Sequence, residues 1–435
     1  MTVARGEVKR SHQRAVSLGH FVAEMNRFHF VTSLEFFMNT LPQVVIRPRR
    51  ALPFFSKHPW VFAGAIASVK GSPAAGDEVA VVTDRGEFIA RGLYNPESNI
   101  RVRLYVWDKE TPLDRAFWSA RLDAAIALRS QILGTSPPRD CRVVYSESDG
   151  LSGLTVDAYQ DWLLVQWTSR GLSTHRETLL DLLREKLQPR GIWLRTERGI
   201  GELEGLDVED GLVWGEAPPQ PILISENGLQ FHVDVVEGQK TGYYFDQRDN
   251  RMAVARLAKG LRVLDAHCYS GSFGITAVKQ GGAREAVCVD SSVGALELAA
   301  KNAEQNGVAG QIQFRKGDVP HVLNDMIEKQ EQFDVVILDP PKMARTRGGL
   351  DRAAKAYLKL NVSAIRLIPP GGFLVSCSCS GLVDQNMFEE ILSKAALDAG
   401  RTMQFLEMRG QSWDHPVSAH CRETAYLKCV IARVV

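Results

Sequence analysis

LRVLDAHCYSGSFG, residues 261–274, is the stretch that decides the fold of this chain. It begins with a short apolar run that ends at Asp265, which is typical of a buried strand that reaches the edge of a sheet. The loop that follows has glycine only at Gly271 and Gly274. This pattern predicts one unit of an open α/β sheet, in which ligands bind at the carboxyl ends of the strands.

The same pattern repeats towards the C-terminus. Four more apolar runs of buried-strand length start at Ala286, Ile312, Asp334 and Gly372. Helical stretches such as 294–306 alternate with these runs. The alternation predicts an α/β domain over residues 226–435, a doubly wound parallel sheet with helices on both faces.

Three other segments precede this domain. Short apolar runs separated by turn residues fill residues 43–115 and predict a small β-barrel. Residues 116–225 show a helix, a hairpin and a second helix, which predicts an α+β middle domain. Residues 1–42 fit neither pattern, so we expect a poorly packed extension, and an over-long start assignment is an alternative explanation for residues 1–37.

Composition excludes several classes of protein. With 435 residues, 45% of them hydrophobic and 24% charged, the chain is neither disordered, nor fibrous, nor a small disulfide scaffold. It lacks an apolar run of the roughly 18 residues that a membrane span needs. The odd set of 7 cysteines suits free thiols in a reducing cytosol, so we expect a cytoplasmic protein without a membrane partner.

Acidic side chains follow three successive strands of the predicted sheet. Asp265, Asp290 and Asp318 each stand where a strand ends. The loop after Asp265 lacks the G-x-G-x-x-G spacing that brings a backbone close to a pyrophosphate. The carboxylates suit a nucleoside that carries a positive sulfonium and amine, so they predict S-adenosylmethionine rather than NAD, although each alone could be a capping residue. Further candidates for cofactor contact are Tyr269, Gly271, Phe273, Asp246, Gln247 and Pro340.

The motif DPPK, residues 339–342, follows another strand. Its two prolines fix φ and remove two backbone donors, which makes a stiff loop. Such a loop can hold a planar base with Asp339, and the alternative is a simple strand terminator.

Cys377 and Cys379 lie at the end of the next strand, in SCSCSG, residues 376–381. C5 of cytosine attacks a methyl sulfonium only after a thiolate has added at C6, and that chemistry needs a cysteine beside the cofactor. The position of this pair therefore favours a catalytic function, and we expect one of the two thiols to be the catalytic group and the other only to pack. For Cys268 and Cys288 we expect inert burial. A single Cys-x-Cys pair does not supply four ligands, so we expect no metal site.

Several of these motifs, in the same order, resemble those of the ribosomal RNA large subunit methyltransferase I family. The resemblance covers residues 43–435. The motifs that carry it are HPWVF (58–62), ESDGLSG (147–153), GYYFDQR (242–248), VLD (263–265), SGSF (270–273), DPPK (339–342) and SCSG (378–381).

The resemblance implies a PUA domain at 43–115, a middle domain at 116–225 and a class I Rossmann-like methyltransferase domain at 226–435. It implies S-adenosylmethionine-dependent methylation of cytosine C5 in 23S ribosomal RNA. Cys379 would then be the nucleophile, and Asp339 would orient the cytosine. Many RNA cytosine-C5 enzymes have a second cysteine just after the two prolines, but Lys342 stands there, so the group that releases the covalent adduct is not assigned.

The first domain has a basic excess that suits RNA. Residues 43–115 contain 11 basic and 8 acidic side chains, a net charge of +3. Such a surface can contact phosphates, and the alternative is a solvated face. The candidate contacts are Arg47, Arg49, Arg50, Lys57, Arg101 and Arg103.

Two rival functions stay open from the sequence. One is methylation of an exocyclic amine of an RNA base or of a protein side chain, and the other is a non-catalytic RNA-binding assembly factor. A homodimer through the barrel or the middle domain is equally compatible with the pattern.

Overall fold

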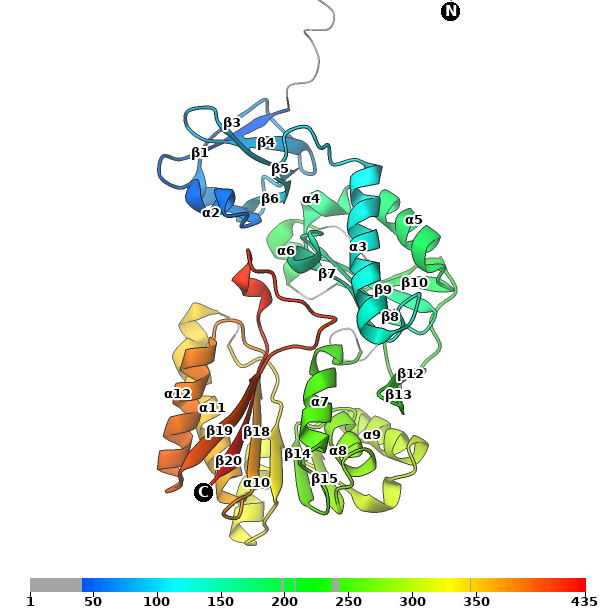
Figure 1. Ribbon diagram of the computed structural model, residues 1–435, viewed down its shortest axis with the longest axis vertical. Coiled ribbons are helices and arrows are strands. Elements are labelled where there is room, and N and C mark those ends of the chain that lie inside the picture. Colours follow the sequence, from blue (N-terminus) through cyan, green and yellow to red (C-terminus); the bar gives the residue numbers. More distant parts are fainter. Residues whose placement is uncertain (1–40, 197–198, 207–208, 237–241, 345) are drawn as a thin grey trace, which may run out of the picture.

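The computed structural model describes residues 41–196, 199–206, 209–236, 242–344 and 346–435. The predicted extension lies outside the described residues, except for Leu41 and Pro42. Three parts follow one another along the chain and are seen one beside the other in Figure 1. No helix in these ranges is both long and apolar enough to cross a membrane.

The N-terminal part is a six-stranded mixed sheet. Its elements are β1 (Gln43–Ile46), α2 (Leu52–Phe55), β2 (Trp60–Phe62), β3 (Ile66–Lys70), β4 (Glu78–Val82), β5 (Phe88–Tyr94) and β6 (Ile100–Val106). The strand order is β2-β6-β5-β4-β1-β3, and β1 runs parallel to β4. Alternate residues such as Val79 and Val81 are fully buried between the strands, as the short apolar runs predicted.

The middle part packs helices on a five-stranded sheet of order β11-β10-β9-β8-β7. Its elements are α3 (Arg115–Leu133), β7 (Cys141–Tyr145), β8 (Leu154–Tyr159), β9 (Trp162–Trp167), α4 (Arg170–Ser173), α5 (Arg176–Leu187), β10 (Gly191–Leu194), α6 (Ile200–Glu204) and β11 (Gly211–Gly215). The side chain of Asp114 caps the first turn of α3, and Gly134 ends it with φ +69°. The predicted helices and the β8–β9 hairpin are confirmed.

A two-stranded hairpin, β12 (Ile222–Glu226) and β13 (Leu229–Val233), connects the middle part to the last one. The predicted boundary between residues 225 and 226 therefore falls inside β12. Two asparagines attach the hairpin to the C-terminal part, Asn302 in α9 (Val293–Gln305) and Asn306 at the C-cap of that helix. Asn302 Oδ1 accepts a hydrogen bond from His232 N, and Asn306 Oδ1 accepts one from Gln230 N.

The C-terminal part is a seven-stranded sheet of order β16-β15-β14-β17-β18-β20-β19. Its remaining elements are α7 (Arg248–Ala255), β14 (Arg262–Ala266), α8 (Ser272–Lys279), β15 (Glu285–Asp290), β16 (Ile312–Lys316), α10 (Val319–Glu328), β17 (Val335–Leu338), α11 (Leu350–Arg366), β18 (Phe373–Ser378), α12 (Gln385–Asp398), β19 (Met403–Arg409) and β20 (Lys428–Val434). The five predicted strands are confirmed as parallel neighbours. β20 runs antiparallel between β18 and β19, which the sequence did not predict.

Helices cover both faces of this sheet, with α8 and α9 on one side and α10, α11 and α12 on the other (Figure 1). Neighbouring strand residues therefore alternate between two cores. Val263 and Cys377 belong to the core under α8, whereas Leu264 and Leu374 belong to the core under α11. The carboxyl ends of β14, β15, β17 and β18 consequently meet along one edge.

The chain between β19 and β20, residues 410–427, leaves the sheet and rises towards both other parts (Figure 1). We call it the β19–β20 connection. It meets the N-terminal part where His420 Nδ1 lies 3.1 Å from Ser56 O, and the middle part where Tyr145 Oη donates to Thr424 O at 2.9 Å. One segment thus touches all three parts of the molecule.

Candidate active site

The loop after β14 presents a buried carboxylate. Asp265 is 1% exposed, and its Oδ2 accepts a hydrogen bond from Gly274 N at 2.9 Å. A Cβ at Gly274 would lie 2.7 Å from Cys288 Sγ, so only glycine allows this approach of α8 to the sheet. Burial raises the pKa of Asp265 to about 7, and the nearby carboxylates of Asp339 and Asp290 add to the shift.

Asp290 at the end of β15 fixes the shape of the same loop. Its Oδ2 accepts from Tyr269 N at 3.0 Å and its Oδ1 from Ser292 N at 2.9 Å. The first bond holds Tyr269 in a left-handed conformation, φ +49°. Gly271, φ +73°, then starts α8. Asp290 therefore acts on the backbone here, while each carboxylate oxygen keeps a further lone pair for a ligand.

Two other predicted cofactor residues lie apart from this cluster. Phe273 is 5% exposed and packs in the core, with the Arg251 guanidinium 5.9 Å from its ring centre. The side chain of Asp318 is 63% exposed and pairs with His321 Nδ1 at 2.8 Å, so it lies on the outer rim. The strand-end pattern placed Asp318 at the correct edge but could not predict its exposure.

Asp246 and Gln247 are buried in the short helical turn Phe245–Gln247 that precedes α7. Their hydrogen bonds fix the β19–β20 connection and the helix. Asp246 O accepts from Ser412 N, its carboxylate accepts from Tyr426 Oη, and Gln247 Oε1 accepts from Asn250 Nδ2. This segment lies beside the loop that follows β14 and is flanked by Asp265 and Asp290, which we call the acidic loop, because the ring centres of Tyr244 and Tyr269 are 5.5 Å apart.

The DPPK loop lies between the acidic loop and the cysteines. Asp339 N donates to Ala266 O at 3.3 Å, Asp339 is half-buried, Pro340 is buried and Lys342 is exposed. The charge of Asp339 helps to raise the pKa of Asp265, of Tyr244 and of Cys377. Asp339 is therefore close to both predicted halves of the site.

Cys377 and Cys379 have different surroundings. Cys377 is fully buried in β18 opposite Cys429 of β20, and a hydrogen bond to that thiol together with burial raises its pKa well above the ordinary value. A thiol held protonated inside the core serves packing, which corrects the prediction of a catalytic role for Cys377. Cys379 follows the strand and is the only one of the seven cysteines that is partly exposed.

The residues on both sides of Cys379 are held firmly. Ser378 Oγ donates to Tyr357 Oη at 3.0 Å, and Ser380 Oγ lies 3.2 Å from the same hydroxyl. Lys428 Nζ donates to Ser380 O at 2.7 Å. Cys379 also interacts electrostatically with Tyr357, Tyr244 and Lys428. Tyr357 and Lys428 were not predicted, because the only sign of them in the sequence is a polar group in an otherwise apolar helix face or strand.

Known proteins resemble this chain in sequence and in fold. Residues 44–107 match the family model of a PUA-like domain, and residues 210–428 match that of an S-adenosylmethionine-dependent methyltransferase. Ribosomal RNA large subunit methyltransferase I of Aeromonas hydrophila is 41% identical over 379 residues, which are 87% of this chain and 95% of the relative. The chain belongs to the ribosomal RNA large subunit methyltransferase I family. The family member of Tolumonas auensis is 40% identical over 394 residues, 90% of this chain and 99% of that one.

The fold is also that of SMU.776, crystallised as a complex with SAH. The two share a TM-score of 0.79 at 18% sequence identity, over 90% of this chain and 99% of the other. The predicted PUA-like and class I methyltransferase domains and the predicted cofactor, S-adenosylmethionine, are confirmed. The site fits this cofactor, because the buried Asp265 Oδ1 has no hydrogen-bond partner among the described residues and can accept from an ammonium group.

The predicted RNA-binding residues of this family member separate into two groups. Arg47, Arg49, Arg50 and Lys57 are exposed, and Arg101 is half-buried. Arg103 is 6% exposed and pairs with Glu147 at 3.0 Å and Glu204 at 3.4 Å. Its prediction as an RNA contact is wrong, because its charge is neutralised in the joint between the PUA-like and middle domains.

A cavity of about 540 Å³ opens beside the exposed arginines. Aromatic side chains form much of its wall, and Phe62 is 42% exposed there. Its charged residues are Arg50 and Glu423, and His58 Nε2 lies 3.4 Å from Glu423 Oε2. The cavity therefore lies where the β19–β20 connection meets the PUA-like domain.

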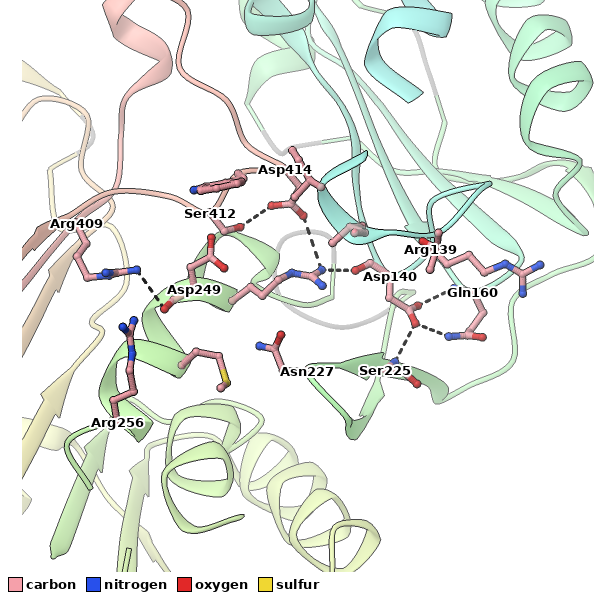
Figure 2. A pocket seen from close by; sticks show the side chains of 16 residues that line it. Arg139, Asp140, Gln160, Ser225, Asn227, Asp249, Arg256, Arg409, Ser412 and Asp414 are labelled. Atoms are coloured by element: carbon pink, nitrogen blue, oxygen red, sulfur yellow. Dashed lines mark hydrogen bonds and ion pairs between the residues drawn. The ribbon is translucent and has the colours of Figure 1, made fainter. Parts of the chain in front are cut away.

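A larger cavity of about 770 Å³ lies between the middle and methyltransferase domains (Figure 2). Several of its polar groups bind one another. Asp140 accepts from Gln160 and from Ser225 N, as the dashed lines in Figure 2 show. The Asp140 carbonyl also accepts from Arg248, so these contacts join the middle domain to the methyltransferase domain.

Proposed function

We propose that this protein methylates C5 of a cytosine in 23S ribosomal RNA through a covalent bond between Cys379 Sγ and C6 of the base. The observation that carries the proposal is the position of Cys379. It is the one partly exposed cysteine, and it lies at the carboxyl edge of the sheet close to Asp339 and the acidic loop. The names of the relatives at about 40% identity support ribosomal RNA as the substrate.

The residues divide the chemistry among them. The bound cofactor supplies an electrophilic methyl group on a sulfonium. Cys379 attacks C6 as a thiolate, which gives C5 enough electron density to take the methyl group. Asp339, on its rigid Pro-Pro loop, holds the base by a hydrogen bond, and Asp265 binds the positive end of the cofactor. Because C6 of a stacked, paired cytosine is closed to a thiolate, the target base is unpaired or flipped out.

Nucleoside analysis tests the proposal. Labelled S-adenosylmethionine is incubated with deproteinised large-subunit RNA and with ribosomal particles, and the digested RNA is separated into nucleosides. We expect the label in 5-methylcytidine. Label in a methylated exocyclic amine would instead support amine chemistry, and cofactor binding without transfer to any RNA would support a non-catalytic role.

Cofactor affinity is expected to fall as the pH falls through about 7. The pKa of Asp265 is raised to about 7 by burial, so below that pH the group is neutral and loses its attraction for the ammonium group. Because the cofactor binds the carboxylate form, its Kd should increase about tenfold as the pH falls from 8 to 6. At the lower pH, cofactor binding should release a proton from Asp265. Calorimetric titration with S-adenosylmethionine at several pH values measures this change. Asp265→Asn should bind weakly at every pH, and an equally steep pH dependence in that variant would contradict the assignment.

RNA affinity is expected to depend on Arg50. Its side chain is exposed at the rim of the cavity that contains Phe62, and the pairing of a cation with an aromatic wall suits an unpaired nucleotide. Arg50→Ala should weaken RNA binding and lower the slope of log affinity against log salt by about one, the value for one phosphate contact. Filter binding across a salt series measures it, with Arg366→Ala at the C-terminal end of α11 as the control. Equal slopes in both variants would exclude the phosphate contact.

A further inference from the structure

A buried lysine stands beside the proposed nucleophile. We propose that Lys428 accepts the proton of the Cys379 thiol and then holds the thiolate as its ion-pair partner. The proposal rests on the function proposed above in one respect, that Cys379 is the attacking group. It assigns to a residue of β20 a role that neither the DPPK loop nor the acidic loop fills.

The register of the sheet brings the two side chains together. Lys428 is the cross-strand partner of Ser378, and its Nζ reaches forward to Ser380 O at 2.7 Å. Cys379 lies between these two contact points. The hydroxyls of Ser378 and Ser380 both contact Tyr357 Oη, so the backbone on each side of Cys379 is held in place next to Lys428.

Two hydrogen bonds of Lys428 Nζ leave the third bonding site of this nitrogen for the thiol. Nζ donates to Ser380 O at 2.7 Å and to Tyr426 O at 2.8 Å. A neutral amine has two N–H bonds and one lone pair, so the two carbonyls take both hydrogens and the lone pair can accept a proton. After the transfer, the third N–H of the ammonium donates to the thiolate.

The charges around Lys428 suit this exchange. It is 5% exposed, and burial lowers its pKa to about 8, while Cys379 and Asp384 raise it and Lys342 lowers it. The ordinary pKa of a thiol is about 8.5, so an amine with this lowered pKa titrates in the same range as an ordinary thiol. Tyr357 and Tyr244 also face Cys379, and both stay protonated near neutral pH because their own pKa values are raised, first of all by burial. Lys428 is therefore the cation near this thiol that can change its charge near neutral pH.

The step balances within the protein. The S–H bond of Cys379 breaks and an N–H bond forms on Lys428, and the electron pair left on sulfur forms the bond to C6. When the adduct later eliminates, a water molecule takes the proton from C5, the C5–H electron pair forms the C5=C6 bond, the C6–S pair returns to sulfur, and Lys428 returns its proton to the thiolate. A neutral amine with a lowered pKa is a common proton acceptor in enzymes.

Thiol alkylation tests this pairing without RNA or methyl transfer. Iodoacetamide is applied to the intact protein from pH 6 to 10, and modification of Cys379 is followed by peptide mass. The other six cysteines are buried, so the native protein favours reaction at Cys379. We expect wild type to have its midpoint below the ordinary value of about 8.5. In Lys428→Met the midpoint should rise by about one unit, with about tenfold slower alkylation at pH 7. Lys394→Met, on the exposed face of α12, is the matched control.

Two results would overturn the proposal. One is a Lys428→Met profile that coincides with wild type in a protein that still binds S-adenosylmethionine and keeps its Tm. The other needs no variant, and is a wild-type midpoint at or above about 8.5. Alkylation reports only on the thiol, so it tests the lysine–cysteine pairing independently of the reaction. A methyl group found in another nucleoside would refute the cytosine chemistry, but the pairing would still be decided by the alkylation profile.

Discussion

Cys379→Ala is expected to reduce methyl transfer to RNA by at least about 1,000-fold while S-adenosylmethionine binding is unchanged. Without the thiolate, C5 of the base lacks the electron density to attack the methyl group. Ser378 and Ser380 keep their bonds to Tyr357 in this variant, so the loop retains its shape. Single-turnover transfer from labelled cofactor measures the rate.

Cys377→Ala is the matched control, because it removes a thiol two residues earlier in the chain, inside β18. It should lower the Tm, since Cys377 is fully buried against Cys429, and leave the rate within about tenfold of wild type. RNA that contains 5-fluorocytidine adds a second readout, since fluorine replaces the C5 hydrogen that must leave as a proton before elimination, and the adduct is therefore trapped. A denaturant-resistant complex with wild type and with Cys377→Ala, but not with Cys379→Ala, is expected. Full transfer by Cys379→Ala would refute the covalent mechanism.

Arg129→Met is expected to lower the free energy of unfolding by about 3–5 kcal/mol, the range for breaking a buried ion pair. Arg129 is 0% exposed and binds both oxygens of Asp149, at 2.6 and 2.8 Å. It also donates to Asp414 O in the β19–β20 connection at 2.8 Å. The substitution leaves Asp149 buried with a lost partner and frees one end of that connection.

Arg115→Met is the control for this change. Arg115 pairs with Glu185, but the two side chains are 48% and 60% exposed, so its loss should cost at most about 1 kcal/mol. Urea unfolding and Tm of both variants make the comparison. Equal destabilisation of the two would show that the buried pair contributes no more than a surface pair.

The strands of the methyltransferase domain were predictable for a physical reason. β14, β15, β17 and β18 lie inside the sheet under helices on both faces, so their central residues form buried apolar runs. β19 lies at the edge of the sheet and alternates half-buried with exposed side chains, and β20 begins with a lysine. β19 therefore lacks an apolar run. β20 contains one at residues 429–432, but the alternation of strands and helices predicts parallel strands and does not reveal a strand that runs antiparallel.

The candidate site was predictable in part, because its members follow predicted strands. Asp265, Asp339 and Cys379 are strand-end residues, and the parallel order of the sheet brings their loops to one edge. Pairing between distant residues was not visible in the sequence. The sequence does not show whether the guanidinium of Arg103 faces solvent or binds Glu204, which lies 101 positions away. In the same way it does not show that Lys428 binds Ser380, 48 positions away.

The β19–β20 connection makes the three domains one structural unit rather than separable modules. Although it belongs to the methyltransferase sheet, Asp414 accepts from Arg142 N and Arg129 of the middle domain, and His420 and Glu423 contact the PUA-like domain. A methyltransferase domain excised at residue 226 would thus expose a long segment whose buried partners had been removed. A chimera with a foreign RNA-binding module would need to restore the contacts of Ser56 and His58, because the same connection leads directly into the strand that begins with Lys428.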